Sequence, residues 1–185
     1  MRSLSYLLFL AGLAVLIPMP RMLAGDFKLE PGFTLLFNGK DLTGWQPKGK
    51  KESLEGKTEA FKGRFKVEKG ALVVDYVVKG DSYIETVKEF PKDVHIKLDF
   101  KPGEGCNNDL IFRGTKFDIV PKALKNAKEG EWSTVEIIAT GDKIEHKVNG
   151  EKKNSTKYKV VTNHLVIRAE LGAIQIKNIR VKEGS

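Results

Sequence analysis

The chain has 185 residues, which is enough for one domain with a two-layer core. Its 32 basic residues outnumber 24 acidic ones, the formal net charge is +8 at pH 7, and a single cysteine excludes an internal disulfide. The basic residues are mostly scattered lysines without a nucleic-acid-binding motif, so we expect a solvated surface attracted to anionic polymers and no nucleic-acid partner.

The first 24 residues have the layout of a secretory signal. Arg2 precedes an apolar run from Leu4 to Ile17, which is followed by two prolines and the small residues Ala24 and Gly25. The run is shorter than the roughly 20 apolar residues that a membrane span needs. We therefore expect residues 1–24 to be a cleaved signal, residues 25–185 to form one domain, and the protein to be secreted or periplasmic. The alternative is an uncleaved signal that anchors the protein in a membrane.

Beyond this leader, apolar residues recur at every second position and almost nowhere at helical spacing, which predicts an all-β domain. Turn-forming pairs such as Asn149-Gly150 separate the apolar segments, as in antiparallel hairpins. Short strands with one apolar side each would pack as two sheets face to face. The strands are expected at Arg64–Glu68, Ala71–Val78, Tyr83–Val87, Val94–Phe100, Asp109–Arg113, Phe117–Val120, Thr134–Thr140, Ile144–Val148, Leu165–Glu170 and Ile174–Val181.

The two ends of the domain are expected to meet, and two stretches depart from the strand pattern. Phe33–Phe37 alternates like a strand and is expected beside the last strand, Ile174–Val181, because the ends of such sandwiches commonly lie together. Gln46–Gly63 is rich in lysine and glycine and has no periodic apolar face, which predicts a long mobile loop. Lys122–Glu129 is the one segment that suits a short helical turn.

Three blocks of sequence occur in a characteristic order. The first runs from Gly32 to Trp45 and contains Leu-Phe-Asn-Gly-Lys-Asp-Leu, the second begins with Gly-Glu-Trp at residues 130–132, and the third is Ile176–Lys182. Together they resemble the 3-keto-disaccharide hydrolase domain family over nearly the whole chain beyond the leader. The resemblance implies an antiparallel jelly-roll sandwich of the concanavalin A-like and glucanase kind, and an activity that cleaves the glycosidic bond of 3-keto sugars.

The site motifs of this family are only partly retained. Members usually carry Asn-Ser-Gly-Ile-x-Phe-Arg in a central strand, where this chain has Asn107-Asn108-Asp109-Leu110-Ile111-Phe112-Arg113. A charged Asp109 thus replaces a glycine, which would alter how a ligand approaches the backbone. Asp118 stands at the position of the family's strand carboxylate. The loop that follows, Pro121–Glu129, is short, and a histidine that the family often shows near the end of the chain is missing.

The reaction that the resemblance implies is an elimination next to the keto group, followed by hydration. It needs a base for the activated proton and an electrophile or a metal for the enolate. We expect the retained polar residues to converge on one concave face. The candidate catalytic residues are Asp118 and Glu170, and the candidate substrate-binding residues are Asn107, Asp109, Arg113 and Arg168. Because Arg168 and Glu170 share one side of their strand, a solvent-facing ion-pair ladder is the alternative.

Other polar and aromatic residues have structural explanations. Trp45 and Trp132 suit sugar-stacking platforms, although corners of the sandwich are favoured. His146 shares the apolar side of its strand, which favours a packed structural histidine. Glu136 is expected to pair with Arg113. The three histidines are not at zinc spacing, so no metal ligands are assigned, the cofactor is unknown, and a divalent metal is left open.

Two functions from different classes remain. One is an enzyme acting on a 3-keto glycoside, with a saccharide as its substrate. The other is a non-catalytic carbohydrate-binding sandwich at the cell surface, in which the same residues only form hydrogen bonds to a glycan. Retained Asn107 and Arg113 and the carboxylate of Asp118 favour catalysis, whereas the missing histidine and the short loop favour binding. The oligomeric state is left open.

Overall fold

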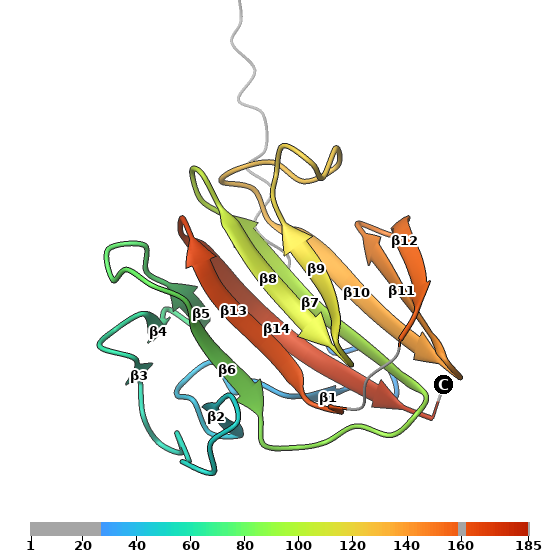
Figure 1. Cartoon of the computed structure of the whole chain (residues 1–185), viewed down its shortest axis with the longest axis horizontal. Coiled ribbons are helices and arrows are strands. Elements are labelled where there is room, and N and C mark those ends of the chain that lie inside the picture. The colour runs from blue at the N-terminus through green and yellow to red at the C-terminus, as the bar shows by residue number, and fades with distance from the viewer. Residues whose placement is uncertain (1–26, 159–161, 185) are drawn as a thin grey trace, which may run out of the picture.

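The domain consists of two antiparallel β-sheets packed face to face, as the computed structural model shows for residues 27–158 and 162–184 (Figure 1). The expected all-β sandwich of two antiparallel sheets is therefore confirmed. The predicted leader, residues 1–24, lies outside the described residues, and export through it stays a prediction. In the described part of the chain, no helix is long and apolar enough to cross a membrane.

The larger sheet, sheet A, has nine strands and the smaller one, sheet B, has five. Sheet A has the order β12 (Glu151–Lys157), β11 (Lys143–Val148), β10 (Ser133–Thr140), β7 (Val94–Pro102), β14 (Ile174–Glu183), β5 (Ala71–Val74), β4 (Phe65–Glu68) and β3 (Glu59–Ala60), with β1 (Thr34–Leu35) also paired to β14. Sheet B has the order β2 (Trp45–Pro47), β6 (Ser82–Thr86), β13 (Leu165–Leu171), β8 (Asn107–Phe112) and β9 (Thr115–Ile119).

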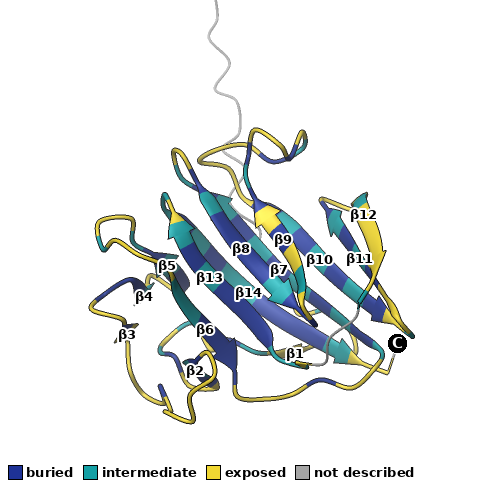
Figure 2. Cartoon of the chain, in the orientation of Figure 1, coloured by how far each residue is buried: buried dark blue, intermediate teal, exposed yellow. Residues whose placement is uncertain are grey.

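The core lies between the two sheets and is built by strict alternation along the strands. In β7, Val94, Ile96, Leu98 and Phe100 are all completely buried, while the residues between them are partly exposed. Sheet B contributes Ile84, Leu110 and Ile167 from its own inner side. Figure 2 shows the same alternation along the central strands, with exposed residues gathered on the edge strands and loops. Because one side of these central strands packs in the core, the other side can carry polar groups.

All ten strands expected from the alternation are present, with small shifts at their ends. The largest shift is in β5, which ends at Val74 instead of Val78. The side chain of Asp75 accepts a hydrogen bond from the Val77 amide at 2.8 Å and pairs with Lys66 at 3.0 Å, so the chain turns there. The edge strand β12 was not expected, because Glu151–Lys157 is polar on both sides and has no buried residue.

The long loop expected at Gln46–Gly63 is interrupted by strands, since the segment contains the end of β2 and all of β3. Leu54 is buried in the core, and its amide donates to the Trp45 carbonyl at 3.1 Å. The Leu42 amide donates to the carbonyl of Lys57 at 2.8 Å. Mobility of the exposed part stays a prediction. The suggested helical turn at Lys122–Glu129 is a series of hydrogen-bonded turns without a helix.

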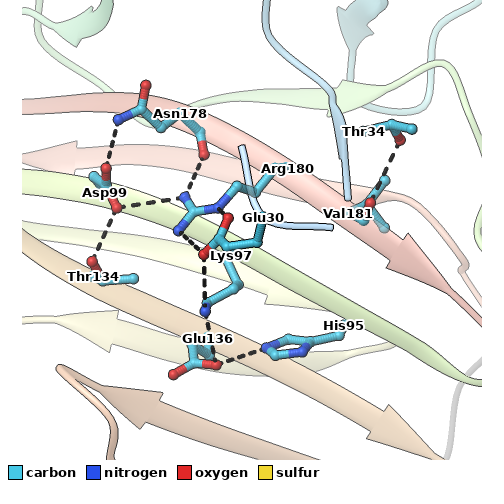
Figure 3. Close-up of polar contacts among 10 residues, drawn as sticks. All are labelled: Glu30, Thr34, His95, Lys97, Asp99, Thr134, Glu136, Asn178, Arg180 and Val181. Carbon is cyan, nitrogen blue, oxygen red and sulfur yellow. Dashed lines mark hydrogen bonds and ion pairs between the residues drawn. The ribbon is translucent and has the colours of Figure 1, made fainter. Parts of the chain in front are cut away.

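The two ends of the domain meet, as expected. Thr34 lies opposite Val181 and Leu35 opposite Arg180, and the Leu36 amide donates to the Ile179 carbonyl at 2.8 Å. The stretch before β1 is held on the outer face of sheet A by Glu30. Its carboxylate accepts two hydrogen bonds from the Arg180 guanidinium, at 2.6 and 3.0 Å (Figure 3).

A polar network continues from Glu30 across sheet A (Figure 3). Lys97 lies between Glu30, at 3.2 Å, and Glu136, at 3.7 Å. Glu136 also contacts Nε2 of His95 at 2.7 Å. The predicted pair of Glu136 with Arg113 is therefore wrong, because Glu136 stands on the outer side of sheet A and its partners belong to the neighbouring strand β7.

We expect Glu30→Gln to destabilise the fold at neutral pH and to reduce its sensitivity to acid. Hydrogen bonding from Arg180 lowers the pKa of Glu30 from 4.5 to about 2, in spite of partial burial. A lowered pKa in the folded state means that the carboxylate contributes its full stability above about pH 4.5 and loses it as the pH falls towards 2. With the carboxylate 36% exposed, solvent screening limits the effect to about 1 kcal/mol.

Urea unfolding of both proteins at pH 7 and pH 3 measures this effect. Glu52→Gln is a suitable control, because Glu52 has only an exposed partner, Lys57, at 3.4 Å. The control should behave like the wild type. Equal losses of stability for Glu30→Gln and Glu52→Gln would show that the contact between Glu30 and Arg180 does not stabilise the fold.

Candidate functional site

The outer side of sheet B carries a row of polar side chains that lie directly opposite one another. Arg168 on β13 is paired with Tyr83 on β6 and with Asp109 on β8, and Asp109 is paired with Asp118 on β9. We call these four residues the polar row. They share a side because their neighbours Ile84, Leu110, Ile167 and Phe117 all point into the core.

Arg168 is the centre of the polar row. Its guanidinium contacts three carboxylates: Asp109 at 2.7 Å, Glu170 at 2.8 Å and Asp81 at 2.6 Å. Hydrogen bonds to Asp81 and Asp109 raise the pKa of Arg168, so it is a permanent cation. The ring of Tyr83 lies 5.7 Å from the guanidinium carbon and borders it on the β6 side. The group is therefore held in place from several strands.

Asp109 is completely buried, although it stands on the outer side of the sheet. Burial raises the pKa of its carboxyl group, while the hydrogen bond from Arg168 opposes this shift. Its Oδ1 has no hydrogen-bond partner, and the nearest cation on that side, Nζ of Lys116, is 3.9 Å away. Asp109 thus holds the Arg168 guanidinium from its buried side. It does not reach the surface where a ligand would lie.

Asp118 is the exposed carboxylate of the polar row, with 49% of its side chain accessible. Partial burial opposes ionisation, but the contacts with Lys116 and with Asp109 outweigh it and lower the pKa of Asp118. Lys116 lies two residues earlier on β9 and its Nζ is 2.5 Å from the Asp118 carboxylate. The two aspartates are therefore shifted in opposite directions: Asp118 holds a negative charge, and Asp109 holds a proton more readily.

Glu170 lies two residues after Arg168 on the same side of β13, next to an irregularity in that strand. The pairing with β8 shifts between Arg168 and Leu171, and Asn108 bridges the shift. Its side chain accepts from the Glu170 amide at 2.9 Å and donates to the Leu171 carbonyl at 2.9 Å. Asn107 is paired with Leu171 and lies two positions before Asp109, on the same side of β8. Asn107 therefore borders the site, while Asn108 is the asparagine that shapes it.

Arg113 does not join the other candidate residues, contrary to the expected convergence. It lies in the β8–β9 turn with a φ of 49°, a left-handed conformation that directs its side chain away from the polar row. Its guanidinium donates to the carbonyls of Pro91 and Lys92 and to Oδ1 of Asn163. It is almost completely buried and stacks on Phe112. Arg113 is thus part of the scaffold.

Neither the two tryptophans nor His146 belongs to the polar row. Trp45 is completely buried, as expected for a corner of the sandwich, whereas Trp132 is 40% exposed. His146 is a structural histidine, because its Nδ1 contacts Asn154 at 2.7 Å and its ring stacks on Phe117. In residues 27–158 and 162–184, no group of three or more His, Cys, Asp or Glu side chains is arranged to hold a metal ion.

Three residues of the site were not singled out from the sequence: Asp81, Tyr83 and Lys116. Lys116 lies two residues before Asp118 on the same side of β9, but the strand was predicted to begin only at Phe117. Tyr83 begins a predicted strand, but its position opposite Arg168 depends on which strands are neighbours. Asp81 lies in a connection before β6, where no periodic pattern fixes the direction of a side chain.

Comparison with known proteins agrees with the sequence resemblance. Residues 32–123 match the 3-keto-alpha-glucoside-1,2-lyase-like domain family. This chain carries a domain of that family. The matched residues of the lyase-like domain include Asp109, Lys116 and Asp118, while β13 with Arg168 lies beyond them. Among proteins of curated function, none matches the sequence.

Solved structures show the same fold at low sequence identity. A candidate glycosyl hydrolase of Parabacteroides distasonis is 22% identical, with a TM-score of 0.63 over 83% of this chain and 94% of that one. A second candidate glycosyl hydrolase of the same organism is 16% identical, with a TM-score of 0.53 over 76% and 99%. The β-glucanase of Bacillus licheniformis is 9% identical, with a TM-score of 0.54 over 82% and 97%. The lyase-like domain is thus a jelly-roll sandwich of the glucanase kind, as expected.

We expect Arg113→Ala to lower the free energy of unfolding by about 3 kcal/mol, because it removes a buried side chain that packs on Phe112 and donates to the carbonyls of Pro91 and Lys92. The polar row should stay intact, since Arg113 makes no contact with it. Chemical denaturation measures the loss. Lys92→Ala is the matched control, because it removes an exposed side chain and keeps the carbonyl that Arg113 binds. A loss below 1 kcal/mol for Arg113→Ala would contradict the scaffold assignment.

Proposed function

We propose that this lyase-like domain cleaves the glycosidic bond of a 3-keto glycoside at the polar row of sheet B. The observation that carries the proposal is the pair formed by Asp118 and Lys116, an exposed ionised carboxylate beside a cation at 2.5 Å. Such a pair offers a base and a positive charge next to one another. Membership of the family supports a carbohydrate as the molecule acted on.

The proposed reaction uses Asp118 as its base. Asp118 removes the proton on the carbon between the keto group and the glycosidic carbon, and the electrons form an enolate. The enolate then expels the glycosidic oxygen, which takes up a proton and leaves as an alcohol, while a carbon–carbon double bond forms. Addition of water across that bond completes a net hydrolysis. A base of this kind contributes roughly 10²- to 10⁴-fold to such a rate.

The cations of the site would stabilise the negative charge that develops on the substrate. Lys116 is closest to the base, and raising of its pKa by Asp118 and Asp109 keeps it protonated. Arg168 is fixed by its three carboxylates and presents a preorganised charge, which needs no rearrangement during the reaction. Glu170, with its carboxylate beside Arg168, is placed to hydrogen-bond to sugar hydroxyl groups.

A carbohydrate-binding module without chemistry is the second candidate. The observation that favours it is the pairing of charges within the site: Asp118 is bound to Lys116, and Arg168 is shared by three carboxylates. A fully paired set of charges can hydrogen-bond to hydroxyl groups without transferring a proton. Incubation with 3-keto disaccharides, with and without a divalent metal, followed by product analysis separates the two candidates.

We expect Asp118→Asn to lower kcat by at least about 100-fold while the fold is retained, because the change removes the base and keeps the size of the side chain. Since the pKa of Asp118 is lowered from 3.8, wild-type turnover should fall on the acid side only below that pH. Asp142→Asn is the matched control. Asp142 is also an exposed aspartate paired to a lysine, Lys157 at 3.0 Å, but it lies in sheet A's β10–β11 turn.

Full turnover by Asp118→Asn would end the catalytic assignment. Saccharide binding without product, in the wild type as well as in the variant, would favour the binding module. Circular dichroism and thermal unfolding of both variants exclude loss of fold as the cause.

A further inference from the structure

The two tryptophans of the chain lie in opposite environments. Trp45 is completely buried, whereas Trp132 is 40% exposed at the residue before β10. Tryptophan is highly buried on average, and the exposed indole of Trp132 is open to a ligand while that of Trp45 is not. Because Ser133 points into the core, Trp132 lies on the outer side of sheet A, and the polar row of sheet B is on the opposite side of the sandwich.

Two lysines flank the indole ring of Trp132. Nζ of Lys177, from β14, lies 4.1 Å from the ring centroid, and Nζ of Lys101, from β7, lies 5.3 Å from it. Both distances allow a cation–π contact. Among the described residues, no carboxylate lies within 4 Å of either ammonium group, so neither lysine has an ion-pair partner.

The carboxylates nearest to this patch along the chain are already engaged. Asp99, the residue opposite Lys177, accepts from Thr134 at 3.0 Å and from Asn178 at 2.6 Å, and it lies 3.5 Å from Arg180. Glu131 is 3.8 Å from Lys128. Among the described residues, the patch made by Trp132, Lys101 and Lys177 thus has two ammonium groups without an ion-pair partner beside an exposed aromatic ring.

We propose that this patch binds an acidic polysaccharide, with a uronic acid residue as the recognised unit. The C–H face of a sugar ring packs against the indole, and the carboxylate of that sugar meets the two ammonium groups. A neutral sugar would leave both lysines without a counter-charge, whereas a small anion would leave the aromatic surface unused. The net positive charge of the chain attracts such polymers at longer range. The proposal does not depend on the chemistry of the polar row.

Titration of the protein with polygalacturonate, followed by tryptophan fluorescence and calorimetry, tests the proposal. We expect saturable binding with a change in the emission of the exposed tryptophan, and no binding of neutral amylose. Trp132→Ala should abolish binding. Lys101→Gln combined with Lys177→Gln should weaken binding by about tenfold and reduce its salt dependence. Both variants should retain the fold and turnover at the polar row, because the three residues are partly exposed and distant from it.

Lys122→Gln combined with Lys125→Gln is the matched control. It removes the same charge from two exposed lysines that have no ion pair in the described structure. Equal weakening by the two double variants would show that only net charge attracts the polymer, and would overturn the site. Equal affinity for amylose, or full binding by Trp132→Ala, would overturn it as well.

Discussion

The burial of one side of the central strands between the two sheets determines where the other side chains of these strands lie. In sheet B, Ile84, Leu110 and Ile167 are completely buried on the inner side. Their neighbours must therefore stand on the outer side, and the pairing of β6, β13, β8 and β9 lines them up. The polar row is thus a consequence of core packing and strand register. A shift of register by one residue would move Arg168 into the core.

The two aspartates of the polar row differ in exposure: Asp109 is buried in an ion pair with Arg168, whereas Asp118 is exposed. A completely buried carboxylate is costly unless it is paired, and removal of one partner typically costs 3–5 kcal/mol. Asp109 stands where the resembled family carries glycine, so a side chain fills space that would otherwise be open to a ligand. Its burial leaves Asp118, at the edge of the row, as the exposed and ionised aspartate. In the proposed reaction, the base is therefore Asp118 on β9, beside Lys116.

Much of the fold could be predicted from alternation, because burial of one side leaves a period of two in the sequence. Strand β12 could not, since a solvated edge strand buries nothing and leaves no such period. In the site, Asp118, Arg168 and Glu170 were brought together as expected, because strands with one buried side must display them on the other. Arg113 was misplaced because its direction is set by a turn with positive φ, which alternation along a strand does not describe.

We propose that saccharides are recognised on the outer side of sheet B. The most direct measurement is an amide NMR titration with a 3-keto disaccharide, in which shifts are mapped onto the strands. We expect saturable shifts centred on Lys116, Asp118 and Arg168, with none near Glu30 and Arg180 on sheet A. Shifts confined to sheet A, or no shifts at saturating disaccharide, would contradict it.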